Sequence, residues 1–288
     1  MAKETEKEKK QVANISNILR NPSVLAALIV SIALIVSSYM IYSGLKYLLI
    51  GGTVIKAEVT DFMDSLRPID PVSIDEYDPS IGNSRDVIMV EFTDYQCPFC
   101  ARHARNTFPL LKENYIDTRK ITYVILDLPL ESIHPYARRM AQYANCVYKE
   151  YGPDTYLEFR RWIYENQDVW SGGNVDELVQ TELSNMGLDI DTILSCANSD
   201  EVNEEINADL SEVQRYRVTG TPGFAIFLKA SKIDNSDYEE LRAIMDELLG
   251  FGVRYNIWKT PDEEYIVVKF SGALPYEYFD RILSLAAN

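Results

Sequence analysis

Two cysteines, Cys97 and Cys100, closely follow an apolar run at 86–92, DVIMVEF, that is rich in β-branched residues. Such a run is typical of a buried strand. Pro98 comes directly after the first cysteine, and proline suits the first position of a helix because its missing N–H would have no partner there. We therefore expect Cys97 at the first turn of a helix, where unpaired amide groups and the helix dipole stabilise a thiolate. Cys100 then lies one turn further on, close enough to form a disulfide with Cys97.

The elements around this pair predict a sheet with a parallel pair of strands. The segment 97–113 has helical character, although Pro109 should bend it or end its first part. The apolar run ITYVILDL at 121–128 predicts a second buried strand. A strand, a helix and a strand within about 40 residues indicate a right-handed β-α-β unit.

Three kinds of site fit such a cysteine pair: a redox centre, half of a zinc site, or two inert buried thiols. A structural zinc site takes four ligands, commonly from two paired motifs, whereas this chain has one Cys-x-x-Cys motif. The other cysteines, Cys146 and Cys196, are far apart in sequence, and His103 and His134 do not form a recognisable ligand pair. We therefore expect redox chemistry and no metal, although the motif alone leaves the zinc and inert alternatives open.

The N-terminal part contains a second strong signal, an uncharged stretch at 21–45. Its 25 residues are enough for a helix to cross a hydrocarbon core of about 30 Å. We expect a transmembrane helix with residues 1–20 in the cytoplasm, because basic residues precede the stretch and acidic residues follow it. A cleaved signal peptide that ends near Ser38 and a buried soluble helix are the alternatives.

Charge differs between the two sides of this stretch. Up to Lys56, seven Lys or Arg and three Glu give a net charge of +4. Because the net charge of the whole chain is −16, the remaining residues carry −20. An acidic outer domain repels phosphate, and we expect no nucleic acid as a partner. Residues 46–84 contain several prolines and acids, which predicts a juxtamembrane linker.

The rest of the chain alternates between helical and strand patterns. Residues 135–214 have helical periodicity and no strand signal, which predicts a helical subdomain inserted into a sheet domain. Two later runs, FAIFLKA at 224–230 and YIVVKF at 265–270, predict further strands. Helices are expected at 237–249 and 275–287.

Thr221-Pro222 stands directly before the strand at 224–230, with Pro222 placed 125 residues after Cys97. With this second feature, the chain resembles the DsbA-like family of thiol:disulfide oxidoreductases. The strings that carry the resemblance are VEFTDYQCPFCARHARNTFPLLKENY, LDLPLESIHPYARRMAQYANC, VTGTPGF and FSGALPYEYF. The resemblance implies an α/β, thioredoxin-like fold with an inserted α-helical subdomain, which residues 85–288 would form.

The resemblance also implies roles for individual residues. Cys97 is expected to be the exposed nucleophile and Cys100 the buried resolving thiol. Thr221 and Pro222 would form the cis-proline loop that packs against the disulfide and pairs with an extended substrate. Glu91 matches the family's buried acid near Cys100, and apolar surroundings should raise its pKa so that it carries a proton to or from that thiol. An outward-facing strand residue is the alternative for Glu91.

Three further features are left with alternatives. His103 would stabilise a thiolate if it were charged, whereas an ordinary surface histidine is the alternative. Cys146 and Cys196 resemble the structural disulfide that some relatives have in the helical tract; a second redox pair or two unpaired core thiols are the alternatives. Residues 230–264 replace the family's short hairpin, which leaves the pairing of the neighbouring strands open.

The direction of the expected reaction depends on the site and on the compartment. Pro98 and Phe99, between the cysteines, provide no positive charge, so we expect a milder oxidant than DsbA. The cytosol keeps thiols reduced, and an outward-facing domain on a single-pass cell-membrane anchor therefore favours oxidation. We expect disulfides to be donated to unfolded secreted or membrane proteins, with no cofactor besides the Cys97-Cys100 disulfide.

A membrane redox partner, such as a quinone-linked enzyme, would restore that disulfide. Two other functions remain open from the sequence. One is a disulfide reductase or isomerase, for example in cytochrome maturation. The other is a non-catalytic thioredoxin-fold binding module or chaperone.

Overall fold

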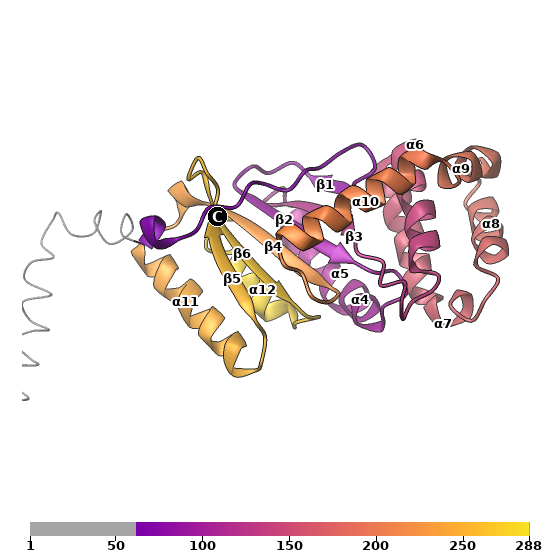
Figure 1. The fold of residues 1–288 in the computed structure, drawn as a ribbon. Coiled ribbons are helices and arrows are strands. Elements are labelled where there is room, and N and C mark those ends of the chain that lie inside the picture. Colours follow the sequence, from indigo (N-terminus) through magenta and orange to yellow (C-terminus); the bar gives the residue numbers. More distant parts are fainter. Residues whose placement is uncertain (1–61, 288) are drawn as a thin grey trace, which may run out of the picture. The chain divides into compact units, whose positions relative to one another are not determined.

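A six-stranded sheet of order β1-β3-β2-β4-β6-β5 runs through residues 62–287, the part of the chain that the computed structural model describes (Figure 1). β2 and β3 are parallel, and every other neighbouring pair is antiparallel. The strands are β1 (Ser80–Gly82), β2 (Val87–Thr93), β3 (Thr122–Asp127), β4 (Gly223–Lys229), β5 (Tyr255–Lys259) and β6 (Tyr265–Ser271). The order places β2 and β4 next to each other at the centre of the sheet.

The parallel β-α-β unit predicted from the apolar runs is confirmed by the pairing of β2 with β3. The expected helix between them consists of four short segments, of which η1 and η2 have π-helical hydrogen bonding. The segments are α4 (Pro98–Arg102), η1 (His103–Thr107), α5 (Phe108–Leu111) and η2 (Lys112–Ile116). Pro109 lies in the first turn of α5, so the helix is interrupted where proline removes a backbone donor.

The helical insertion lies between β3 and β4, in the tract where helices are expected. Its helices are α6 (Ala137–Glu165), α7 (Gln167–Trp170), α8 (Val175–Asn185), α9 (Ile190–Ala197) and α10 (Asp200–Arg215). α6 is kinked at Gly152, where φ is 80°, and Pro153 follows. Figure 1 shows α6 to α9 gathered at one end of the sheet and α10 returning along one face of it.

Both faces of the sheet are covered, which explains the continuous apolar runs of its central strands. The core on the α10 side contains Val90, Phe92, Val124, Leu126, Val213, Tyr216, Val218, Ala225, Phe227 and Val267. On the other face, the rings of Phe224 and Phe270 contact Phe279 of α12 (Tyr276–Leu283), with centroids 4.9 and 5.7 Å away. Full burial of one such large apolar side chain contributes about 1.5–3 kcal/mol.

The prediction of a linker over 46–84 is wrong for its described part, which packs against the sheet. β1 pairs with β3, and the Ile69 amide donates to the Lys259 carbonyl at 2.9 Å. Met63, Ile69 and Tyr77 are all at most 8% exposed. These apolar residues are separated by prolines and acids and have no helical or strand period. Each of them is buried individually, without apolar neighbours at a regular spacing, so the sequence pattern does not indicate their burial.

The segment 230–264 forms an additional helix and an edge strand. α11 (Asn235–Gly250) begins with a capping box at Asp234 and buries Leu241, Ile244 and Leu248. β5 then pairs with the outer side of β6, and β6 pairs with β4. The insertion therefore widens the sheet at its edge and leaves the neighbour of β4 unchanged.

The expected cytoplasmic tail at 1–20 and membrane helix at 21–45 lie outside the described residues. Between residues 62 and 287, no helix has the length and apolar character needed to cross a membrane.

Candidate active site

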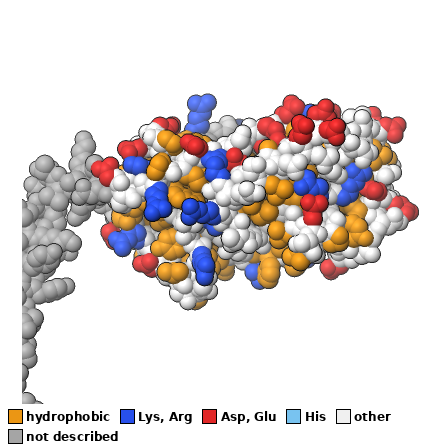
Figure 2. All heavy atoms as spheres, in the orientation of Figure 1, with side chains coloured by type: hydrophobic (Ala, Val, Ile, Leu, Met, Phe, Trp, Pro, Cys, Tyr) orange, Lys and Arg blue, Asp and Glu red, His pale blue; other side chains and the backbone are white. Residues whose placement is uncertain are grey.

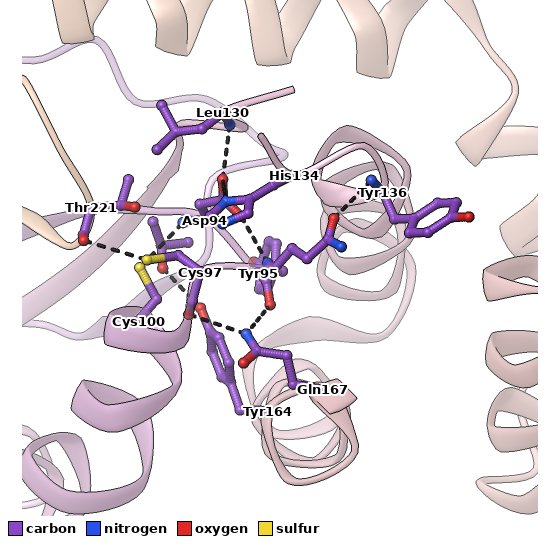
Figure 3. Close-up of polar contacts among 12 residues, drawn as sticks. Asp94, Tyr95, Cys97, Cys100, Leu130, His134, Tyr136, Tyr164, Gln167 and Thr221 are labelled. Carbon is purple, nitrogen blue, oxygen red and sulfur yellow. Dashed lines mark hydrogen bonds and ion pairs between the residues drawn. The ribbon is translucent and has the colours of Figure 1, made fainter. Parts of the chain in front are cut away.

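Cys97 and Cys100 lie where β2 leads into α4, as the proline after Cys97 predicts (Figure 3). Cys97 is the N-cap of α4, with φ −74° and ψ 125°, and Pro98 is in the first turn. Both cysteines are free thiols. Cys100 has no exposed surface and Cys97 is 4% exposed. The prediction of an exposed nucleophile is thus wrong in degree, because the loop at Thr221 packs on Cys97.

This loop contains the expected cis-proline. The Thr221-Pro222 peptide bond is cis, and β4 starts directly after it. Since Gly223 of β4 pairs with Phe92 of β2, the loop lies beside the cysteines. The Sγ atom of Cys97 donates to the Thr221 carbonyl oxygen at 3.5 Å. The hydroxyl of Thr221 is buried and has no hydrogen-bond partner among residues 62–287. The cis bond is confirmed; substrate binding by this loop stays a prediction.

The two thiols have opposite pKa shifts. The pKa of Cys97 is lowered to about 6, chiefly by a hydrogen bond with the Cys100 thiol and further by Thr221 and the amides of Cys100 and Phe99, against the effect of burial. Burial raises the pKa of Cys100 well above its ordinary value, and the neighbouring Cys97 and Glu91 add to the rise. Cys97 therefore carries the negative charge near neutral pH, and the thiolate is the nucleophile in disulfide exchange.

The two residues between the cysteines form an exposed apolar loop. Pro98 is exposed, and Phe99 is 53% exposed. The guanidinium of Arg102, in the last turn of α4, lies 5.1 Å from the centre of the Phe99 ring. This arrangement presents an apolar surface and one cation beside the nucleophile.

Comparison with known proteins agrees with this geometry. The thioredoxin family model matches residues 75–247. A Rickettsia typhi protein named as a protein-disulfide oxidoreductase is 28% identical over 179 residues, which make up 61% of this chain and 63% of that protein. The disulfide bond formation protein D of Bacillus anthracis is 24% identical over 208 residues, covering 70% of this chain and 91% of its own. The chain belongs to the thioredoxin family as a DsbA-like protein.

A solved structure shares the fold of this chain. The crystal structure of Wolbachia pipientis alpha-DsbA1 has a TM-score of 0.54 and 20% sequence identity, and the match covers 75% of this chain and 93% of that one. At this identity the likeness concerns the fold alone. The thioredoxin-like α/β fold with helical content is thereby confirmed. The chain spans less than two thirds of the length of the Rickettsia typhi relative, 63%.

The predicted proton carrier of this DsbA-like site, Glu91, does not have the expected raised pKa. It has no exposed surface, which excludes the outward-facing alternative. Its Oε2 accepts hydrogen bonds at 2.7 Å from Arg160 Nη2 and from the Tyr123 hydroxyl, and its Oε1 accepts one at 3.1 Å from Thr93. Burial works to raise the pKa of Glu91, but Arg160 and these hydrogen bonds lower it below its ordinary value. Glu91 is a paired carboxylate rather than a stored proton.

Both readings of His103 are also wrong. The residue is fully buried, its Nε2 lies 3.0 Å from the Tyr123 hydroxyl, and its ring contacts Phe224 and Phe279. Burial, together with the charge of Arg160, lowers the pKa of His103 to about 4. A histidine that is neutral at pH 7 cannot stabilise a thiolate by charge, and it is not a surface residue.

The second cysteine pair is bonded. A disulfide joins Cys146 of α6 to Cys196 of α9 across a sequence separation of 50. This bond excludes two unpaired core thiols. Its structural role, as opposed to electron relay, stays a prediction.

Three side chains beside the dithiol were not found from the sequence. Gln167 of α7 donates to the carbonyl oxygens of Tyr95 and Cys97 at 2.8 and 3.1 Å, which ties the helical insertion to the active-site loop. Asp94, which lies in the active-site loop between β2 and Cys97, is paired with His134 (Figure 3). Asp94 and His134 lie in strings that carry the family resemblance, but no local pattern shows these contacts, because they join segments that are distant in the sequence.

One group of acidic side chains among the described residues has the donor set of a metal site. It does not include either cysteine of the active site. The ligand atoms of Asp75, Asp78 and Glu205 all lie within 4.8 Å of one another. Oδ1 of Asp78 is buried without a hydrogen-bond partner within residues 62–287. The dithiol chemistry described above does not involve this group.

Proposed function

We propose that this DsbA-like protein is a thiol:disulfide oxidoreductase that introduces disulfides into other proteins through Cys97 and Cys100. The observation that carries the proposal is the opposite pKa shift of the two thiols, with Cys97 lowered to about 6 and Cys100 raised. A site that stabilises the Cys97 thiolate stabilises the reduced protein, and its disulfide is then a good oxidant.

Of the two sulfurs, only that of Cys97 belongs to a residue with any exposed surface, 4%, so the exchange starts there. A client thiolate attacks Sγ of Cys97, the Cys97-Cys100 bond breaks, and Cys100 leaves as a thiolate that takes up a proton. A second client thiolate then attacks the client sulfur of the mixed disulfide, and Cys97 leaves as the stabilised thiolate. Two electrons pass from the client to the protein, which ends as a dithiol. A membrane redox partner, such as a quinone-linked enzyme, would restore the disulfide.

The surface near the dithiol suits an unfolded polypeptide as the client. Three large apolar side chains are strongly exposed in segments that contact the active-site loop or belong to it: Phe99 by 53%, Ile133 by 67% and Val169 by 61%. Phe99 lies between the cysteines, and Val169 is two residues from Gln167, which binds the Cys97 carbonyl. Unfolded secreted or membrane proteins display the apolar segments that such a surface would bind.

The location is proposed from the sequence. The uncharged stretch at 21–45 and the change of charge across it favour a membrane tether with the catalytic domain outside the cytoplasm. That compartment lets disulfides persist. A tether would also keep the protein close to a membrane partner.

The test is a single-turnover oxidation. The full-length protein, oxidised and in detergent, is mixed with an equimolar amount of a reduced, unfolded dithiol protein. We expect one disulfide to form in the client for each Cys97-Cys100 pair reduced, as counted by alkylation and mass spectrometry. The Cys97→Ser variant should form none. A client that stays reduced, together with rapid reduction of a preformed client disulfide, would replace the oxidase proposal by the reductase alternative.

A further inference from the structure

A carboxylate–imidazole pair lies beside the dithiol and has no role in the exchange described above. Asp94 follows β2 directly, three residues before Cys97, and His134 belongs to the connection between β3 and α6. The Oδ2 atom of Asp94 and the Nδ1 atom of His134 are 2.8 Å apart. The backbone N–H of Asp94 points at the Cys100 sulfur, 3.5 Å away. In Figure 3, His134 and Thr221 flank Asp94 and the two sulfurs from opposite sides.

Asp94 is held firmly in place. Its side chain has no exposed surface. The backbone N–H of Gln96 donates to Oδ1 at 2.7 Å, and the backbone N–H of Leu130 donates to Oδ2 at 2.8 Å. A carboxylate has no proton to donate and can only accept hydrogen bonds. The Nδ1 atom of His134 must therefore be the donor.

This contact fixes the tautomer of His134. With the proton on Nδ1, the Nε2 atom of a neutral imidazole is left as an acceptor. No residue between 62 and 287 forms a hydrogen bond with Nε2, and the side chain is 16% exposed. The backbone around the ring is also fixed, because the His134 amide donates to the Leu130 carbonyl at 2.9 Å. The pair thus presents an oriented base to solvent beside the active-site loop.

The exchange reaction has a use for such a base. A free thiol with a pKa of about 8.5 is only about 3% ionised at pH 7, so removal of its proton can raise the rate of attack by at most about 30-fold. The other candidate bases cannot meet an incoming client. Glu91 is fully buried and paired with Arg160, and His103 is fully buried against Tyr123.

We infer that His134 is a catalytic base, oriented by the positioning residue Asp94, that takes the proton of the client thiol as this thiol attacks the Cys97-Cys100 disulfide. The inference rests on the proposed function. The client S–H bond breaks and its proton goes to Nε2 of His134. The client sulfur bonds to Cys97, the Cys97-Cys100 bond breaks, and its electron pair stays on Cys100. The imidazolium then returns its proton to solvent.

The test compares two monothiols at a fixed pH of 7. Glutathione is largely protonated at this pH, whereas thionitrobenzoate is an aryl thiolate that is already ionised. The full-length protein is oxidised, mixed with either thiol, and quenched in acid to measure how fast the Cys97-Cys100 disulfide opens. The main variant is His134→Asn, whose amide can still donate to Asp94 from the position of Nδ1. Glu131→Gln, an exposed change in the same connection, is the matched control.

We expect His134→Asn to slow the reaction with glutathione by about tenfold, within the ionisation limit, and to leave the reaction with thionitrobenzoate unchanged. Asp94→Asn should show the same selective loss, because it would favour the wrong tautomer. Glu131→Gln should match the wild type with both thiols. Equal losses with both thiols would mean that His134 only supports the loop, and unchanged rates would mean that it does nothing; either result overturns the inference. A wild-type protein that reacts with neither thiol would instead refute the proposed function.

Discussion

The ion pair between Glu91 and Arg160 joins α6 of the helical insertion to β2, the strand that leads to the two cysteines. The guanidinium comes from α6 and meets the carboxylate at 2.7 Å, with Glu91 0% and Arg160 2% exposed. The Arg160→Met change would leave a buried carboxylate without its counter-ion. We expect the free energy of unfolding to fall by about 3–5 kcal/mol, as measured by urea denaturation.

The double variant Glu91→Gln/Arg160→Met is the control for this prediction. It removes both charges, and we expect it to lose clearly less stability than Arg160→Met alone. Equal losses in the single and double variants would show that packing of Arg160 against Phe108, 4.5 Å from the ring centre, matters more than its charge.

The thiolate of Cys97 is a second residue-level prediction. We expect its alkylation by iodoacetamide in the reduced protein to follow a pKa of about 6. The Thr221→Val variant removes a hydroxyl that is buried without a hydrogen-bond partner in the described chain. The midpoint of alkylation should then move to higher pH, because Thr221 helps to lower the pKa of Cys97. A midpoint that stays the same would assign the shift to Cys100 and the backbone amides alone.

At the scale of single residues, the sequence predicts which residues belong to the site better than it predicts whether they are charged. Cys97, Cys100 and Thr221-Pro222 are recognisable because each belongs to a short string next to a strand. The family resemblance also predicts a buried Glu91. Its partner Arg160 is 69 residues away, so the sign of the pKa shift depends on a tertiary contact that no local pattern contains. The same holds for His103 and for the pair of Asp94 and His134.

The disulfide between α6 and α9 defines a test at the scale of elements. It closes a loop with a sequence separation of 50, and on the chain-entropy model its removal costs roughly 3–5 kcal/mol. We expect the Cys146→Ala/Cys196→Ala variant to unfold at a lower urea concentration. Its rate of client oxidation by Cys97 and Cys100 should stay at the wild-type value under native conditions. A folded variant that has lost oxidation would support the electron-relay alternative.

Elements with a long apolar run or a periodic apolar face were predictable from the sequence. Segments whose structure depends on packing against the rest of the domain were not. β2, β3, β4 and β6 are continuous apolar runs, and α11 has a capping residue and a periodic apolar face. β1 has three residues, which is too short for a period to appear. The π-helical segments η1 and η2 leave no signal in the residue pattern. The segment that docks before β1 also has no periodic signal, so the residue pattern predicts a linker there.

At the scale of the whole molecule, buried acids should make stability depend on pH. Acidic side chains gather over α10 (Figure 2). Burial raises the pKa of Asp78 and of Asp127 to about 7, and that of Glu205 to about 9. The folded state therefore holds protons that the unfolded chain has lost, and the free energy of unfolding should fall as pH rises from about 4 to about 9.

Urea denaturation at a series of pH values checks this prediction. Stability contributed by these acids is complete below their ordinary pKa, which is 3.8 for aspartate, and is lost as pH passes their raised values. The Asp78→Asn variant should show a shallower decline between pH 4 and 7. A free energy of unfolding that rises over this range would contradict the account of these buried acids.

The central claim, that the site stabilises the dithiol and so oxidises other thiols, is tested most directly by its reduction potential. The full-length protein is equilibrated with glutathione buffers, and the fraction of reduced Cys97-Cys100 is counted by alkylation. With Cys97 lowered to a pKa of about 6, we predict a potential between that of DsbA, about −120 mV, and about −250 mV. A potential below about −250 mV, near that of thioredoxin, would contradict the account.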